Sequence, residues 1–150
     1  MSVRRALSVG LFCIFLFANL SVSATEPLEI RLTKGWIREA PPVSTTLAGY
    51  LIIENQSEQS VVIVGGRSPS FGGIEIHRTA VIDGVARMNH EERLVVPAGS
   101  TLRLQPGGYH LMLMKPERAL KAGDRVPLEL FLEGAGIIST ELEVQKDDAR

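Results

Sequence analysis

The sequence predicts an all-β fold, a single-domain β-sandwich with Greek-key connections. Short segments in which apolar and polar residues alternate recur along the chain, and this is the period of a strand with one face on a core. Turns that contain glycine or proline separate these segments at fairly regular spacing. No amphipathic stretch of about ten residues lies between them, so a parallel α/β fold is disfavoured. The 150 residues fit one ordinary domain.

The N-terminal segment differs in composition from the rest. Two arginines precede an apolar run from Ala6 to Leu20, and small residues follow up to Ala24. This pattern is typical of a secretory signal peptide. The run of about fifteen apolar residues is shorter than the roughly twenty that span a bilayer. We therefore expect a signal peptide at 1–24, a mature domain at 25–150, export, and no stable membrane insertion after cleavage.

Cysteine and charge restrict the chemistry of the mature domain. The single cysteine, Cys13, lies inside the expected signal peptide, and Phe12 before it disfavours lipidation, which needs a small residue there. Removal of Arg4 and Arg5 leaves 14 basic residues against 17 acidic ones, a formal charge of −3. This balance argues against nucleic acid or anionic lipid as a partner. Without a thiolate, metal ligands must be imidazole, thioether or oxygen.

The chain predicts eight to ten strands in all, and its first half contributes four strands and a short strand or edge segment at 36–38, separated by turn residues. Gly35 is expected to end the first, and Pro41 to end the second, because proline lacks a ladder donor. The third is apolar on both faces, and a hairpin with the fourth is the expected pairing. The only tryptophan, Trp36, is expected in the core. The expected ranges are 28–32, 36–38, 46–55, 60–64 and 73–80.

The second half predicts six further strands. Asp83-Gly84 marks a tight reversal before the first of them, and the polar residues 89–92 are expected to be irregular. The polar connection 115–124 is expected to hold at most one helical turn. The last two strands should form an antiparallel hairpin, followed by a frayed tail at 145–150. The expected ranges are 85–88, 94–96, 101–104, 109–114, 126–132 and 138–144.

Soft and borderline metal donors gather in the segment 77–114, which contains every histidine and three of the four methionines. Imidazole suits several transition metals, whereas the neutral, polarizable thioether favours Cu(I) over zinc, magnesium or calcium. The strand period puts His110, Met112 and Met114 on one face of their strand. The six donors are His77, Met88, His90, His110, Met112 and Met114.

Two imidazoles and two thioethers form a neutral donor set that suits a monovalent d¹⁰ cation in roughly tetrahedral geometry. His110 and Met112 point the same way, and His77 and Met88 lie near the two ends of the reversal. These four donors, from two places in the chain, can therefore converge at one end of a sandwich. Because a thioether loses no proton, binding should persist to mildly acidic pH, until the histidines protonate.

The spacing of these four donors is specific. Ten residues separate His77 from Met88, twenty-one separate Met88 from His110, and one separates His110 from Met112. The pattern resembles the His-x₁₀-Met-x₂₁-His-x-Met signature of the periplasmic copper chaperone family PCu(A)C. The resemblance extends to Trp36-Ile37-Arg38, Ala48-Gly49-Tyr50, Pro97-Ala98-Gly99 and the run from Pro106 to Met114.

The resemblance implies a cupredoxin-like β-sandwich that binds Cu(I) through His77, Met88, His110 and Met112. It also implies a periplasmic, non-enzymatic copper chaperone that delivers copper to the Cu(A) centre of cytochrome c oxidase. The implied partners are a Sco-type protein and cytochrome c oxidase subunit II, and we expect a monomer. Two departures are visible: Arg78 stands where many members have methionine, and the C-terminal tail lacks the histidine and methionine of some relatives.

The sequence allows two interpretations for each of three nearby residues. Met114 is either core filler or a lining residue, because a flexible thioether often packs irregular gaps. His90, beside two glutamates, is either a solvated histidine or an auxiliary ligand. Glu75 shares a strand face with His77 and is either an acceptor that orients the imidazole or an ordinary exposed carboxylate.

Other functions fit the sequence less well. A blue-copper electron carrier needs a cysteine thiolate, and no hydrolase arrangement such as His-Glu-x-x-His is present. The alternatives that remain are a copper storage or resistance protein and a metal-free structural or interaction module, because β-sandwiches host many functions.

Overall fold

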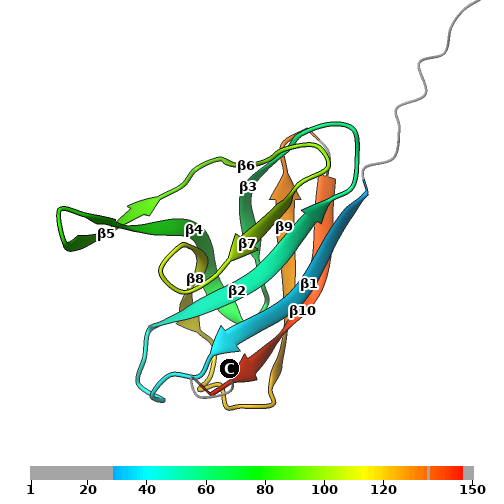
Figure 1. Cartoon of the computed structure of the whole chain (residues 1–150). Coiled ribbons are helices and arrows are strands. Elements are labelled where there is room, and N and C mark those ends of the chain that lie inside the picture. The colour runs from blue at the N-terminus through cyan, green and yellow to red at the C-terminus, as the bar shows by residue number, and fades with distance from the viewer. Residues whose placement is uncertain (1–28, 135, 147–150) are drawn as a thin grey trace, which may run out of the picture.

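The computed structural model describes residues 29–134 and 136–146 and shows an all-β fold in these ranges (Figure 1). The expected signal peptide lies outside the described residues, as do the last four residues of the tail. None of the described segments is a helix of the length and apolarity that a membrane crossing requires. The strands are β1 (Ile30–Arg38), β2 (Thr46–Asn55), β3 (Val61–Arg67), β4 (Phe71–Ile82), β5 (Val85–His90), β6 (Leu94–Val96), β7 (Thr101–Leu104), β8 (Tyr109–Pro116), β9 (Arg125–Leu132) and β10 (Gly136–Gln145).

The strands follow the order β5-β4-β8-β7-β2-β1-β10-β9-β3-β6, and β3 also pairs with β4. This extra pairing closes the sheet on itself as a sandwich-like barrel. The β1–β10 and β7–β8 pairs are parallel and the others are antiparallel. The β4–β5 hairpin projects from the body of the barrel (Figure 1), and β5 stands at one end of the strand order. The all-β prediction is confirmed.

Alternate residues of the strands fill the interior. Along β8 the buried Leu111 and Leu113 alternate with Met112 and Met114, and along β4 the buried Ile74 and Ile76 belong to the same core cluster. The residues between them therefore lie on the outer face of the β4–β8 pair. The inner residues with no measurable exposure are Ile37, Ile53, Ile63, Val96, Leu111, Leu113, Leu142 and Val144.

The expected break at Gly35 is wrong, because β1 continues through it. The register with β2 shifts between Thr33 and Trp36, and Lys34 has a left-handed φ of 51°. A Cβ on Gly35 would lie 2.6 Å from Leu142 Cδ2, so this glycine permits close approach of β1 to β10. The bulge displaces the tryptophan from the expected core position to a half-buried one.

The expected hairpin between β2 and β3 is also wrong. β2 pairs with β1, β7 and β8, whereas β3 pairs with β4, β6 and β9. The buried Asn55 ends β2, and its amide donates hydrogen bonds to the carbonyls of Gln59 at 2.8 Å and Val96 at 3.0 Å. These bonds hold the chain where it crosses between layers, so the polar turn is a crossover.

In two further segments the structure settles a point that the sequence left open or misplaced. The connection 115–124 contains no helical turn. Instead, the Asp124 carboxylate accepts hydrogen bonds from the Lys121 amide and the Arg118 guanidinium, both at 2.9 Å, while Leu120 is buried. The second segment is 89–92: β5 continues through His90, so this histidine lies on a strand.

Leu111 tests the core assignment, because it lies between two metal-donor positions but faces inward. We expect Leu111→Ala to lower the free energy of unfolding by about 2–5 kcal/mol through lost burial and the cavity left behind. Ile137→Ala, at a side chain that is 52% exposed, is the matched control and should change it by no more than about 0.5 kcal/mol. Urea denaturation measures both, and equal losses would contradict the assignment.

Candidate metal centre

Three neighbouring strands carry all six candidate donors. β4 pairs with β5 on one side and with β8 on the other, so that His77 lies opposite His90 and also opposite His110. Cross-strand partners point to the same face of a sheet. The ring centres of His77 and His90 are 5.4 Å apart, and those of His77 and His110 are 6.0 Å apart. The three imidazoles therefore form a row across the outer face, which we call the histidine row.

The two remaining predicted ligands flank this row. Met112 lies opposite Glu75 and Met88 lies opposite Thr79, so each methionine is a diagonal neighbour of His77, on opposite sides of the row. Diagonal neighbours are about 7–8 Å apart, within reach of a long side chain. The structure thus surrounds one histidine with all the other predicted ligands.

The environment of these donors is uneven. His110 is buried, with 6% of its surface exposed, and Met112 is half-buried. Met88 is 54% exposed because every residue of β5 faces solvent. The predicted set therefore consists of three inner donors and one outer donor.

Hydrogen bonding orients the His77 ring. Nε2 donates to Oε2 of Glu75 over 2.8 Å, while Nδ1 is buried and has no hydrogen-bond partner. A buried polar atom without a partner is costly unless something else binds it. A metal-bound imidazole commonly donates its other nitrogen to a carboxylate in this way. The structure confirms Glu75 as the hydrogen-bond acceptor for this imidazole, and the Nδ1 atom has no hydrogen-bond partner.

A second hydrogen bond orients His110. Its Nδ1 donates to the carbonyl oxygen of Gly108 over 3.1 Å, and the same oxygen accepts from the Thr79 amide over 3.0 Å. The tight turn before β8 thus fixes the ring from the backbone. Nε2 is left as the nitrogen that carries a lone pair.

The donors fit a soft cation better than a hard one. Two imidazoles that share an ion through bonds of about 2 Å have ring centres about 5–6 Å apart, close to the 6.0 Å observed between His77 and His110. Within residues 29–134 and 136–146, no three His, Cys, Asp or Glu side chains are gathered for a metal ion. Met112 adds a thioether beside the two imidazoles, and thioether sulfur favours Cu(I).

Met114 and His90, whose roles the sequence left open, have different surroundings in the structure. A Cβ on Gly73, the β4 partner of Met114, would lie 3.1 Å from the Met114 methyl group, so this methionine covers a glycine. That contact fits packing. His90, expected in an irregular segment, lies instead on β5 beside His77. The two-residue turn at Asp83-Gly84 contained the missing signal, because it fixes the hairpin register and hence the pair.

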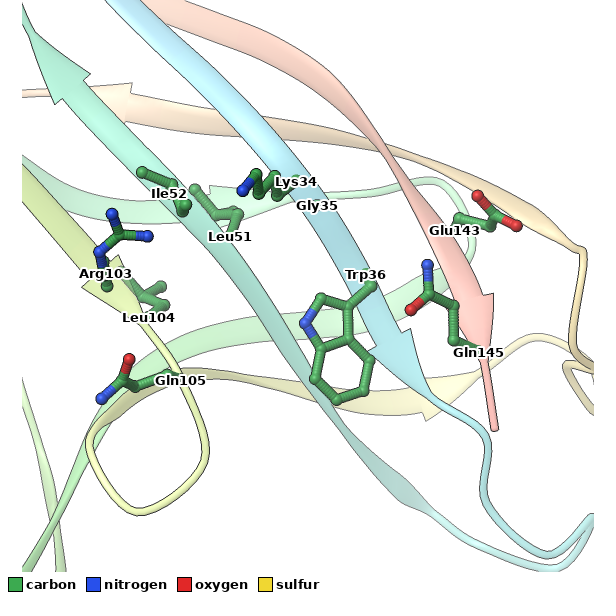
Figure 2. A pocket seen from close by; sticks show the side chains of 10 residues that line it. All are labelled: Lys34, Gly35, Trp36, Leu51, Ile52, Arg103, Leu104, Gln105, Glu143 and Gln145. Carbon is green, nitrogen blue, oxygen red and sulfur yellow. The ribbon is translucent and has the colours of Figure 1, made fainter. Parts of the chain in front are cut away.

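A separate pocket of about 450 Å³ lies on the outer face of β7, β2, β1 and β10 (Figure 2). Figure 2 shows Trp36 between Arg103 on the β7 side and Gln145 on the β10 side. None of the six donors lines this pocket. The donors therefore lie in a surface array on strands, apart from this hollow.

The chain matches one known protein family and is similar to several solved structures. Residues 30–144 match the family model described as "Putative lipoprotein LpqE-like". The solution structure of CuI-DR1885 from Deinococcus radiodurans is 30% identical, with a TM-score of 0.61 over 76% of each chain. The copper-bound PCuAC domain from PmoF2 is 21% identical, with a TM-score of 0.65 over 78% of this chain and 92% of that domain. The latter shows the same fold.

Two curated relatives are also similar. "Putative lipoprotein Lxx21020" of Leifsonia xyli subsp. xyli (strain CTCB07) is 31% identical over 123 residues, which cover 78% of this chain and 73% of the relative. The uncharacterized protein RP573 of Rickettsia prowazekii (strain Madrid E) is 32% identical over 87 residues, or 57% and 48% of the two chains.

The Glu75–His77 contact predicts a measurable acidity. The hydrogen bond from His77, with smaller contributions from the charges of His90 and His77, lowers the pKa of the Glu75 carboxyl below its ordinary 4.5. In ¹³C NMR titrations of the metal-free protein, we expect a pKa below 4.5 that rises towards 4.5 in His77→Ala. An unchanged pKa in that variant would contradict the contact.

The same contact predicts how stability depends on pH. Because folding lowers this pKa, ionised Glu75 stabilises the folded state above pH 4.5, and that contribution is lost as the pH falls through the lower folded value. The difference in unfolding free energy between the wild type and Glu75→Gln should therefore shrink as the pH falls below 4.5. Denaturant titrations at several pH values measure it, and a difference that grows on acidification would refute the prediction.

Proposed function

We propose that this chain is an exported Cu(I) carrier that passes copper to another protein. The chain belongs to the PCuAC family through its match to the LpqE-like model. The observation that carries the proposal is the pairing of two oriented histidines with a neighbouring thioether. His77 and His110 each engage one nitrogen in a hydrogen bond and leave the other available. Met112 supplies soft sulfur beside them.

The relatives support the choice of metal. The 30% identical structure from Deinococcus radiodurans is described with Cu(I), and the PCuAC domain from PmoF2 is described as copper-bound. The cysteine-free mature chain offers no thiolate, and a neutral His/Met set suits monovalent copper. We therefore infer that His77, Met88, His110 and Met112 bind one Cu(I) ion as cargo.

The uneven burial of the donors suggests how the cargo leaves. His110, His77 and Met112 sit on the inner strands β8 and β4, whereas Met88 sits on the exposed edge strand β5. Met88 must reach across the row to complete the site, so it is the ligand that an incoming donor replaces first. Exchange of one thioether for a ligand of the recipient moves the ion without any change of oxidation state.

The wider role is part of the same proposal. We infer a cupredoxin-like Greek-key domain that acts in the periplasm as a monomer and is not an enzyme. The recipient is the Cu(A) centre on cytochrome c oxidase subunit II, reached directly or through a Sco-type protein. Relatives named as lipoproteins support export. The single Cys13 follows Phe12, and this disfavours a lipid anchor here.

Removal of both thioethers tests the Cu(I) site. We expect Met88→Ala plus Met112→Ala to weaken Cu(I) binding about 100-fold, roughly tenfold for each ligand lost, as measured by competition with a chromogenic Cu(I) chelator. Met114→Leu is the matched control, because it removes a thioether from the same face of β8, and it should bind like the wild type. Unchanged affinity in the double variant would refute the assignment.

Deletion of the gene tests delivery. We expect cytochrome c oxidase activity to fall at limiting copper and to recover on copper supplementation, because a carrier matters only when its cargo is scarce. The wild-type gene should restore the activity, and the double methionine variant should fail to restore it. Full oxidase activity without the gene, together with increased copper sensitivity, would instead indicate storage or resistance.

A further inference from the structure

His90 is the one member of the histidine row that the proposed Cu(I) set does not use. It lies on β5 directly opposite His77, and their ring centres are 5.4 Å apart. This separation is within the range of about 5–6 Å expected for two imidazoles that share a metal ion. The exposed strand leaves its side chain room to change rotamer.

The groups nearest to His90 on this face carry nitrogen and oxygen atoms. Glu75 accepts a hydrogen bond from His77 over 2.8 Å, and His90 faces the same imidazole from β5 with a ring separation of 5.4 Å. Because the Glu75 carboxylate is engaged with His77, the row offers three imidazoles, a set of nitrogen donors without sulfur. Such a set suits Cu(II), which also binds most tightly among the divalent first-row metals.

We propose that His90, with His77 and His110, forms a Cu(II)-binding set that overlaps the Cu(I) set. The inference rests on the proposed function, because the two sets share two histidines and only one of them can be filled at a time. In the described ranges no three His, Cys, Asp or Glu side chains are already gathered around one point. The Cu(II) set therefore forms only when the exposed His90 side chain rotates toward the other two histidines. Cu(I) binds His77 and His110 together with Met88 and Met112, whereas Cu(II) binds the same two histidines together with His90.

The test uses the metal-free mature protein, with CuSO₄ as the Cu(II) probe and a Cu(I) chelator competition in parallel. We expect His90→Ala to weaken Cu(II) binding at least about tenfold and to remove one nitrogen from the electron paramagnetic resonance spectrum. Cu(I) affinity should stay within about twofold. Asn89→Ala is the matched control, because Asn89 is the next residue on β5 and pairs with Arg78 on the other face.

Several outcomes would overturn the proposal. Cu(II) affinity and spectrum that do not change in His90→Ala would show that His90 is not a ligand. Equal losses of Cu(I) and Cu(II) affinity would place it in the Cu(I) site. Zn(II) binding as tight as Cu(II) binding would make the set a general dication site. Thermal unfolding of each metal-free variant checks that it folds.

The double methionine variant separates this proposal from the proposed function. If Met88→Ala plus Met112→Ala loses Cu(I) binding but retains Cu(II) binding, both proposals are supported. If it retains Cu(I) binding, the proposed function fails, and the comparison of His90→Ala with Asn89→Ala still decides the Cu(II) set.

Discussion

The pairing of β4 with β8 is the constraint on which the site depends. One register places Ile76 opposite Leu111 on the inner face and His77 opposite His110 on the outer face. A slip of one residue in β8 would turn His110 toward the hydrophobic core and Leu111 toward the outer face. The hydrophobic core therefore fixes the metal donors, because the same backbone ladder positions both faces.

Much of the fold could be predicted from the sequence because each strand signals its own period. The range of β2 matches the expectation, and alternation correctly separated the two faces of β8. The partners of the strands could not be predicted in the same way. The β2–β3 hairpin was wrong because pairing depends on distant contacts such as the bond from Asn55 to Val96, and these leave no local pattern.

The candidate site, too, could be predicted from the sequence only in part. Residue type and spacing singled out the donors. Which of them are buried and which are exposed could not be predicted, because alternation alone does not give the burial of residues on an edge strand. His90 was misplaced because its polar neighbours resemble a loop, although the two-residue turn at Asp83-Gly84 fixes its partner as His77. The contact between Glu75 and His77 was foreseen as one of two readings because both lie on one strand face.

The outward position of the donors also affects how the site can evolve. Since Met88, His90 and Met112 project from the side of the sheet opposite the core, a mutation that exchanges one of them leaves the packing of leucine and isoleucine beneath it intact. Descendants of one ancestral barrel could therefore acquire different metal preferences with little loss of folding stability. The edge strand β5, which carries two of the donors, is the segment on which such divergence would be least costly.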